Sequence, residues 1–140
     1  MSCLPERQAR ACYSCDSKRV RRRAAAENIL TAHPNLSGIF ASSEAASIGS
    51  IQAIRSRGLS GKVKLVTFDS SESHIEALKD GTIDLMLVQD PARLGYEAVK
   101  SLALKLRGQT IAKRMELPVR EIVKADLDRP DVRVLLPPPW

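Results

Sequence analysis

Three short apolar runs in this chain are each followed by polar residues and then by a segment of helical length. The runs are residues 38–41, 63–68 and 83–88, and the segments after them are about 42–57, 73–80 and 91–107. The second and third runs alternate too little for half-exposed strands, so we interpret them as strands buried on both faces. Strands that alternate with helices through short connections form a parallel sheet with right-handed crossovers. The pattern therefore predicts an α/β fold.

Further elements flank these three units. A helix is expected before the first strand, from a cap at Asp16 or Ser17 to about His33. Residues 115–123 can supply one more strand after the last helix. That last helix has its own signal, because Pro91 suits a first helical position, where no N–H is needed. Its apolar residues at helical spacing are Leu94, Ala98, Leu102 and Leu106.

Charge divides the chain into parts. The formal net charge is +6, but residues 1–23 hold seven Lys or Arg against two acidic residues, while residues 24–140 hold fifteen against fourteen. We expect a basic, cysteine-containing arm at 1–23, a body at 24–136 and a proline-rich tail at 137–140. A nearly neutral body with 4% aromatic residues disfavours a nucleic-acid partner. The basic run at 18–23 could contact phosphates, but a solvated helix face is the favoured interpretation.

The sequence gives little support for an enzyme, a cofactor or a metal. The turns after the strands lack the glycines that cradle phosphate, and no G-x-S-x-G motif is present. His33 and His74 are interpreted as surface or capping residues, the latter at an exposed helix start. Cys3, Cys12 and Cys15 could be combined with His33 as a zinc site or, in part, as a redox pair. Their spacing matches neither, so we predict no metal site, no cofactor and no enzymatic activity.

Membrane insertion is not expected. No window approaches 18 uninterrupted apolar residues, and the first ten residues hold a Pro, a Glu and two Arg where a signal peptide would be apolar. From the sequence as written we expect neither a membrane span nor an export signal.

Polar residues stand where each of the three strands is expected to end. They are Ser42, Ser43 and Glu44, then Asp69, Ser70 and Ser71, then Gln89 and Asp90. Ligands of parallel α/β sheets bind beyond the carboxyl ends of the strands, and hydroxyl, carboxylate and amide groups suit a neutral polyhydroxy ligand. The alternative is that these residues only cap the helices that follow. Gln89 fits that alternative least, because Gln is not a preferred cap.

Several segments carry a family resemblance. Residues 25–34 with 38–41, 64–69, 80–84, 88–91, 94–96 and 124–127 resemble, in order, segments of the C-terminal half of type I periplasmic sugar-binding proteins. These are the ribose-binding-like solute receptors of ABC importers. The resemblance covers about residues 24–136. It implies a partial type I periplasmic-binding-protein fold, in which helices flank a parallel sheet on both faces.

The resemblance also implies a ligand set. Asp69 and Gln89 match family positions that hydrogen-bond sugar hydroxyls. Ser43 stands where many members have Asn, and Glu44 where members often have Asp. The chain would therefore bind a small sugar through Ser43, Glu44, Asp69 and Gln89.

The family context adds expectations about partners and location. Members are roughly twice this long and close two lobes on the ligand, so the resemblance implies a truncated substrate-binding component of an ABC sugar transporter. Its partners would be a sugar and either the transporter permease or the missing N-terminal lobe. Location would be periplasmic by resemblance, or cytoplasmic if the chain is expressed as written. The alternative is the effector-binding portion of a LacI-type transcriptional regulator, although the N-terminus shows no helix-turn-helix pattern.

Overall fold

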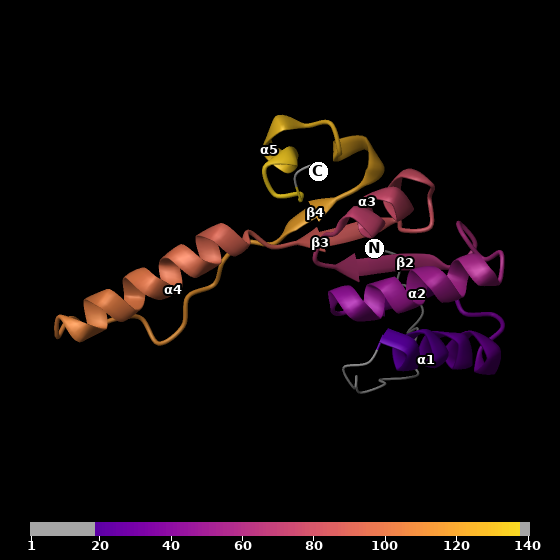
Figure 1. Cartoon of the computed structure of the whole chain (residues 1–140), viewed down its shortest axis with the longest axis horizontal. Coiled ribbons are helices and arrows are strands. Elements are labelled where there is room, and N and C mark those ends of the chain that lie inside the picture. The colour runs from indigo at the N-terminus through magenta and orange to yellow at the C-terminus, as the bar shows by residue number, and fades with distance from the viewer. Residues whose placement is uncertain (1–18, 138–140) are drawn as a thin grey trace, which may run out of the picture.

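A four-stranded sheet forms the centre of the computed structural model, which describes residues 19–137 (Figure 1). The strand order is β1-β2-β3-β4. The strands are β1 (Gly38–Ala41), β2 (Lys64–Phe68), β3 (Leu85–Val88) and β4 (Arg120–Ile122). The first three are parallel, and β4 is antiparallel to β3. The predicted α/β fold is confirmed, and β4 lies inside the segment expected to supply a further strand.

Helical segments precede, connect and follow the strands of this sheet. They are α1 (Arg19–Ala32), α2 (Glu44–Ser56), α3 (Glu72–Lys79), α4 (Pro91–Leu106), the 3-10 helix η1 (Lys124–Asp126) and α5 (Pro130–Arg133). Helix α2 contacts β1 and β2, α3 contacts β3 and α2, and α1 packs on α2. Since α2 and α3 touch each other as well as the sheet, they cover the same face of it. Within the described part of the chain, none of the helices has the length and apolar character needed to cross a membrane.

The core lies between the sheet and these two helices. Its largest fully buried apolar side chains are Ile54, Leu65, Leu78, Ile83, Met86, Ile122 and Val88. Burial alternates along β2 and β3: Leu65 and Met86 are buried, while Val66 and Leu87 are half-buried. The interpretation of these strands as buried on both faces is therefore wrong for the second face, because α2 and α3 pack on the first only.

Helix α1 packs unusually close to α2. A Cβ atom at Gly49 of α2 would lie 2.8 Å from the backbone of both Arg22 and Arg23 in α1. This approach brings Ala26 and Leu30 of α1 into the core, where each is 4% exposed. Glycine at this one position of α2 therefore fixes where α1 lies.

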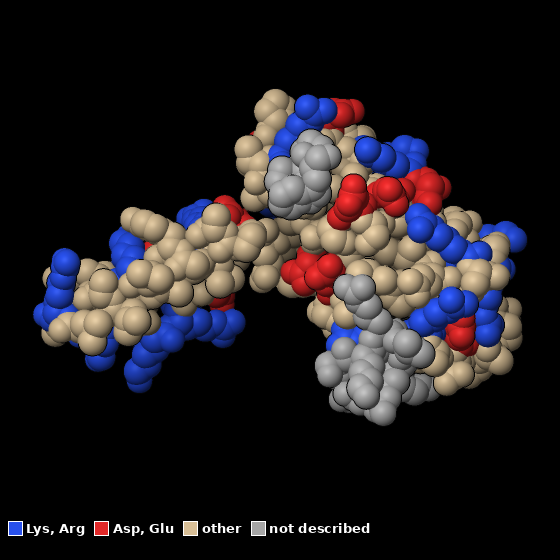
Figure 2. Space-filling model, in the orientation of Figure 1, with Lys and Arg blue, Asp and Glu red and all other residues tan. Residues whose placement is uncertain are grey.

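Helix α4 projects from the body as an arm, with residues 109–119 returning beside it (Figure 1). It begins at Pro91 as predicted, and the carboxylate of Asp90 accepts a hydrogen bond of 2.9 Å from the backbone N–H of Arg93. None of its residues is buried. Leu102 and Leu106 are 59% and 80% exposed. Figure 2 shows the arm as a largely uncharged surface with Lys and Arg at its edges.

Candidate functional site

The three parallel strands end at one edge of the sheet. Ala41 of β1 pairs with Thr67 of β2, and Phe68 of β2 pairs with Leu87 of β3. The backbone N–H of Asp69 extends this ladder by donating to the carbonyl oxygen of Leu87 at 2.9 Å. Ser43, Asp69 and Gln89 each follow one of these strand ends by one or two residues, so the candidate ligand residues stand along the same edge.

Asp69 has an unusual backbone conformation. Its φ of 71° is the one positive value among the non-glycine residues 19–137. The left-handed region costs an L-residue about 1 to 2 kcal/mol, and Asp tolerates it better than most. The N-cap position of α3 is Ser71 and not Asp69. The capping alternative therefore does not account for Asp69, and residues held in this conformation cluster at functional sites.

Ser43 caps α2, as the capping alternative predicts. Its Oγ accepts hydrogen bonds from the backbone N–H of Ala46 at 3.4 Å and from Nη1 of Arg22 at 3.1 Å. These two bonds use both acceptor positions of the hydroxyl and leave its hydrogen to donate. Ser43 can therefore cap a helix and still present one donor at the edge.

Arg22 is a site residue that sequence reasoning missed. The basic run was interpreted as a solvated helix face, which is correct for exposed Arg23 with its 2.7 Å bond to Glu27. It is wrong for Arg22, whose half-buried side chain reaches Ser43 from α1. The contact joins residues 21 positions apart through the packing at Gly49, so no local signal could have found it.

Glu44 is the first residue of α2 and is exposed. A carboxylate at the first turn of a helix is favoured by the helix dipole. It also adds a second carboxylate to the edge that carries Asp69. Glu44 therefore has a structural explanation that is compatible with a ligand role.

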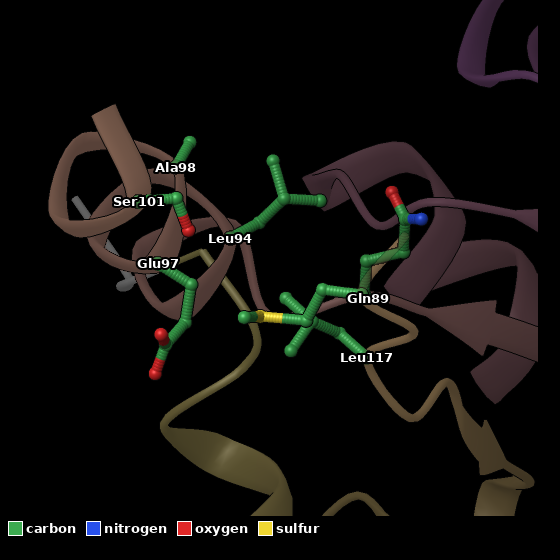
Figure 3. Close-up of a pocket in the computed structure, with 7 residues that line it drawn as sticks. Gln89, Leu94, Glu97, Ala98, Ser101 and Leu117 are labelled. Carbon is green, nitrogen blue, oxygen red and sulfur yellow. The ribbon is translucent and has the colours of Figure 1, made fainter. Parts of the chain in front are cut away.

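Gln89 is half-buried at the rim of a pocket of about 330 Å³ where α4 leaves the body (Figure 3). The pocket is lined by Gln89, Leu94, Glu97, Ala98, Ser101, Met115 and Leu117. Its walls come from α4 and from the segment that returns beside it. In Figure 3 the amide of Gln89 points away from Glu97 and Ser101. Gln89 thus stands between the strand edge and the arm.

His74 is buried, which corrects the interpretation of an exposed helix start. Its side chain is 0% exposed, and Nδ1 lies 2.6 Å from the Oγ of Ser71. Burial lowers the pKa of His74 below its ordinary value of 6.5, while the negative charges of Glu44 and Asp69 act in the opposite direction. Sequence reasoning missed this burial because it depends on the packing of α3 on α2 and β3.

Replacing Ser43 by Ala is expected to lower the free energy of unfolding by about 1 kcal/mol, because α2 loses its cap and Arg22 loses a partner. Urea unfolding of the full chain measures the change. The matched control is Ser42→Ala, a neighbouring exposed serine outside the helix, which should change stability by less than about 0.5 kcal/mol. Equal effects of the two substitutions would contradict the assignment of the cap.

The described residues hold no cluster of three or more His, Cys, Asp or Glu side chains that could bind a metal. The three cysteines, and with them the possible zinc and redox sites, lie outside the described residues.

Comparison with known proteins identifies the family. A family model described as a periplasmic binding protein domain matches residues 8–110. The ribose import binding protein of Escherichia coli is 26% identical over 81% of this chain and 38% of its own length. Members of this family bind solutes and are not enzymes. Because this relative is an import protein and not a regulator, the regulator alternative is not favoured.

Solved structures of related proteins have the same fold as this chain and match it over a similar share of their length. An ABC transporter solute-binding protein from Agrobacterium vitis, solved with α-D-tagatopyranose, has a TM-score of 0.80 and 28% identity over 87% of this chain and 41% of its own. One from Agrobacterium radiobacter, in complex with D-arabinose, has a TM-score of 0.79 and 30% identity over the same shares. The chain thus spans about two fifths of the length of the relatives it matches. It belongs to the periplasmic binding protein family, in its ribose-binding-like type I branch.

Proposed function

We propose that this chain supplies the second, sugar-binding lobe of a periplasmic receptor that delivers a small sugar to an ABC importer. The observation that carries the proposal is the strained Asp69, which stands with Ser43 and Gln89 at the carboxyl edge of the three parallel strands. The relatives solved with tagatose and arabinose support a sugar as the ligand.

The chemistry of the edge suits sugar hydroxyls. An ionised Asp69 accepts hydrogen bonds from two hydroxyls, and Gln89 can both donate and accept. Ser43 retains one hydroxyl hydrogen to donate, because Arg22 and Ala46 occupy its acceptor positions. Glu44 adds a further acceptor. The set offers more acceptors than donors, which matches a ligand rich in hydroxyl groups.

A first lobe, in the same polypeptide or as a separate chain, would complete the cleft. Helix α4 carries an unburied apolar surface at Tyr96, Val99, Leu102 and Leu106, and the pocket at its base is open beside Gln89. A sugar at the strand edge would keep one face in water until something covers that side. Hydrogen bonds to ligand strengthen when water is excluded, so the second lobe should bind sugar weakly by itself.

Isothermal titration calorimetry against a panel of pentoses and hexoses tests this function. The full chain is expected to show no binding at submillimolar concentration, and the chain joined to the first lobe of a ribose-binding relative is expected to bind one of the sugars. Tight sugar binding by the chain alone would contradict the need for a first lobe. Failure of the joined protein to bind any sugar, with both lobes folded, would overturn the sugar-binding assignment.

Asp69→Ala is expected to weaken sugar binding by the joined protein about 30-fold, because two hydroxyls lose a charged acceptor. Ser43→Ala should cost less, since a single neutral donor is removed. Asp128→Ala is the control, because the side chain of Asp128 is 94% exposed on the C-terminal segment and should not affect affinity. Equal losses for Asp69→Ala and Asp128→Ala, measured by the same calorimetry, would remove Asp69 from the site.

A further inference from the structure

We propose that His74 is a positioning residue for the 69–71 loop, and that protonation of its ring moves this loop, so that the ligand edge of the sheet responds to pH. The role of this loop in sugar binding rests on the proposed function. The coupling between the ring and the loop does not, because it follows from burial and hydrogen bonding alone.

The first observation is the bond between His74 and the cap residue of its helix. Ser71 is the N-cap of α3, yet its side chain makes no capping hydrogen bond. Its Oγ lies 2.6 Å from Nδ1 of His74 and 3.0 Å from the Oγ of Ser73. The imidazole therefore makes the shorter of the two contacts that hold the Ser71 side chain, and Ser71 ends the loop that begins at Asp69.

The second observation is the other ring nitrogen. Nε2 of His74 is buried and has no hydrogen-bond partner. A neutral imidazole carries one N–H, which can point from Nδ1 to Ser71 and leave Nε2 as a bare acceptor. A second proton on Nε2 would place a charged donor where no acceptor is available, and that is costly in a buried site. The ring can accept this proton only if its surroundings change.

The third observation is the position of the negative charges that could stabilise a protonated ring. Among the described residues, the charged groups that act on the ring are Glu44 at the start of α2 and Asp69 after β2. Both are carboxylates, and both are candidate ligand residues. An imidazolium would be stabilised by moving toward them, so the protonated ring would compete with ligand hydroxyls for the same oxygens.

The pH range follows from the sign of the shift. Burial holds the pKa of His74 below its ordinary 6.5 in the folded chain. As the pH falls below 6.5, the unfolded chain binds the proton first, so the free energy of unfolding decreases until the folded pKa is passed. The neutral ring and its loop contact are therefore intact at neutral pH and are lost only as the pH falls through the lowered pKa of the folded chain.

NMR spectroscopy of the full chain between about pH 8 and pH 4 tests the coupling. The chain has only two histidines, His33 and His74, so a His33→Gln variant assigns both imidazole signals. We expect His74 to titrate below pH 6.5, with the backbone amide signals of residues 69–71 shifting at the same midpoint. Amide signals that remain unchanged through the His74 midpoint would overturn the proposal, and so would titration of His74 at or above 6.5.

The His74→Gln variant provides the matched comparison, because its side-chain amide is polar but does not titrate. It should abolish the loop step at the histidine midpoint, whereas His33→Gln should leave the step unchanged. A step that persists in a folded His74→Gln chain would assign the shift to another group and refute the coupling. If this variant does not fold, the pH titration of His74 and the 69–71 amide signals in the His33→Gln chain still tests the coupling. The experiment needs no sugar, so its failure is distinct from failure of the proposed function.

Discussion

Replacing both Leu102 and Leu106 of α4 by Glu is expected to weaken association with a first lobe at least about a thousand-fold, because each substitution would bury an unpaired charge costing several kcal/mol. In the absence of a first lobe, the free energy of unfolding of the double variant should stay within about 0.5 kcal/mol of the parent value. The two leucines are 59% and 80% exposed, so little packing is lost in the lone chain. Calorimetric titration with the separately expressed first lobe of a relative measures the association.

Val134→Glu is the matched control for this pair. Val134 is also a large apolar residue, 81% exposed, but it lies after α5 rather than on the arm. It should leave association unchanged. If Val134→Glu weakened association as much as the α4 pair, the effect would reflect added negative charge and not the arm surface. Unchanged association of the α4 pair would show that the first lobe does not cover α4.

The helices and strands were predictable where the chain carries strong local signals. Asp90 and Pro91 form a cap and a first helical position within two adjacent residues, and α4 begins there. The three mostly apolar runs contain the three parallel strands, because a strand that packs on a core needs apolar residues along at least one face. The position of Asp69 at a strand end followed from the same pattern. Local signals of this kind depend only on neighbours in sequence.

The exposure of side chains was less predictable, because it depends on elements far along the chain. The apolar residues of α4 lie at helical spacing, but this spacing does not say how exposed they are, and Leu94 is 47% exposed. For His74 the sequence suggested an exposed helix start, while the packing of α3 on α2 and β3 buries the residue. The same limit applies to the bond between Arg22 and Ser43, which depends on the packing of α1 on α2.

Gly49→Val should lower the free energy of unfolding by about 3 kcal/mol, the upper end of the usual cost of overpacking a close contact. The added Cβ would meet the backbone of Arg22 and Arg23 at 2.8 Å, and backbone cannot rotate aside as the end of a flexible side chain can. Helix α1 would have to move away from α2. Ala26 and Leu30 would then lose burial, and Arg22 would lose its bond to Ser43. Urea unfolding measures the loss.

Gly95→Ala provides the control, because Gly95 is also a glycine within a helix but has nothing within 4 Å of the added Cβ. Alanine there should raise stability by about 0.5 to 1 kcal/mol through helix propensity alone. The opposite signs of the two substitutions separate close packing from the general preference of helices against glycine. A Gly49→Val chain as stable as the parent would mean that α1 does not pack on α2 at this distance. The hydrogen bond from Arg22 to the candidate ligand residue Ser43 would then have no structural basis.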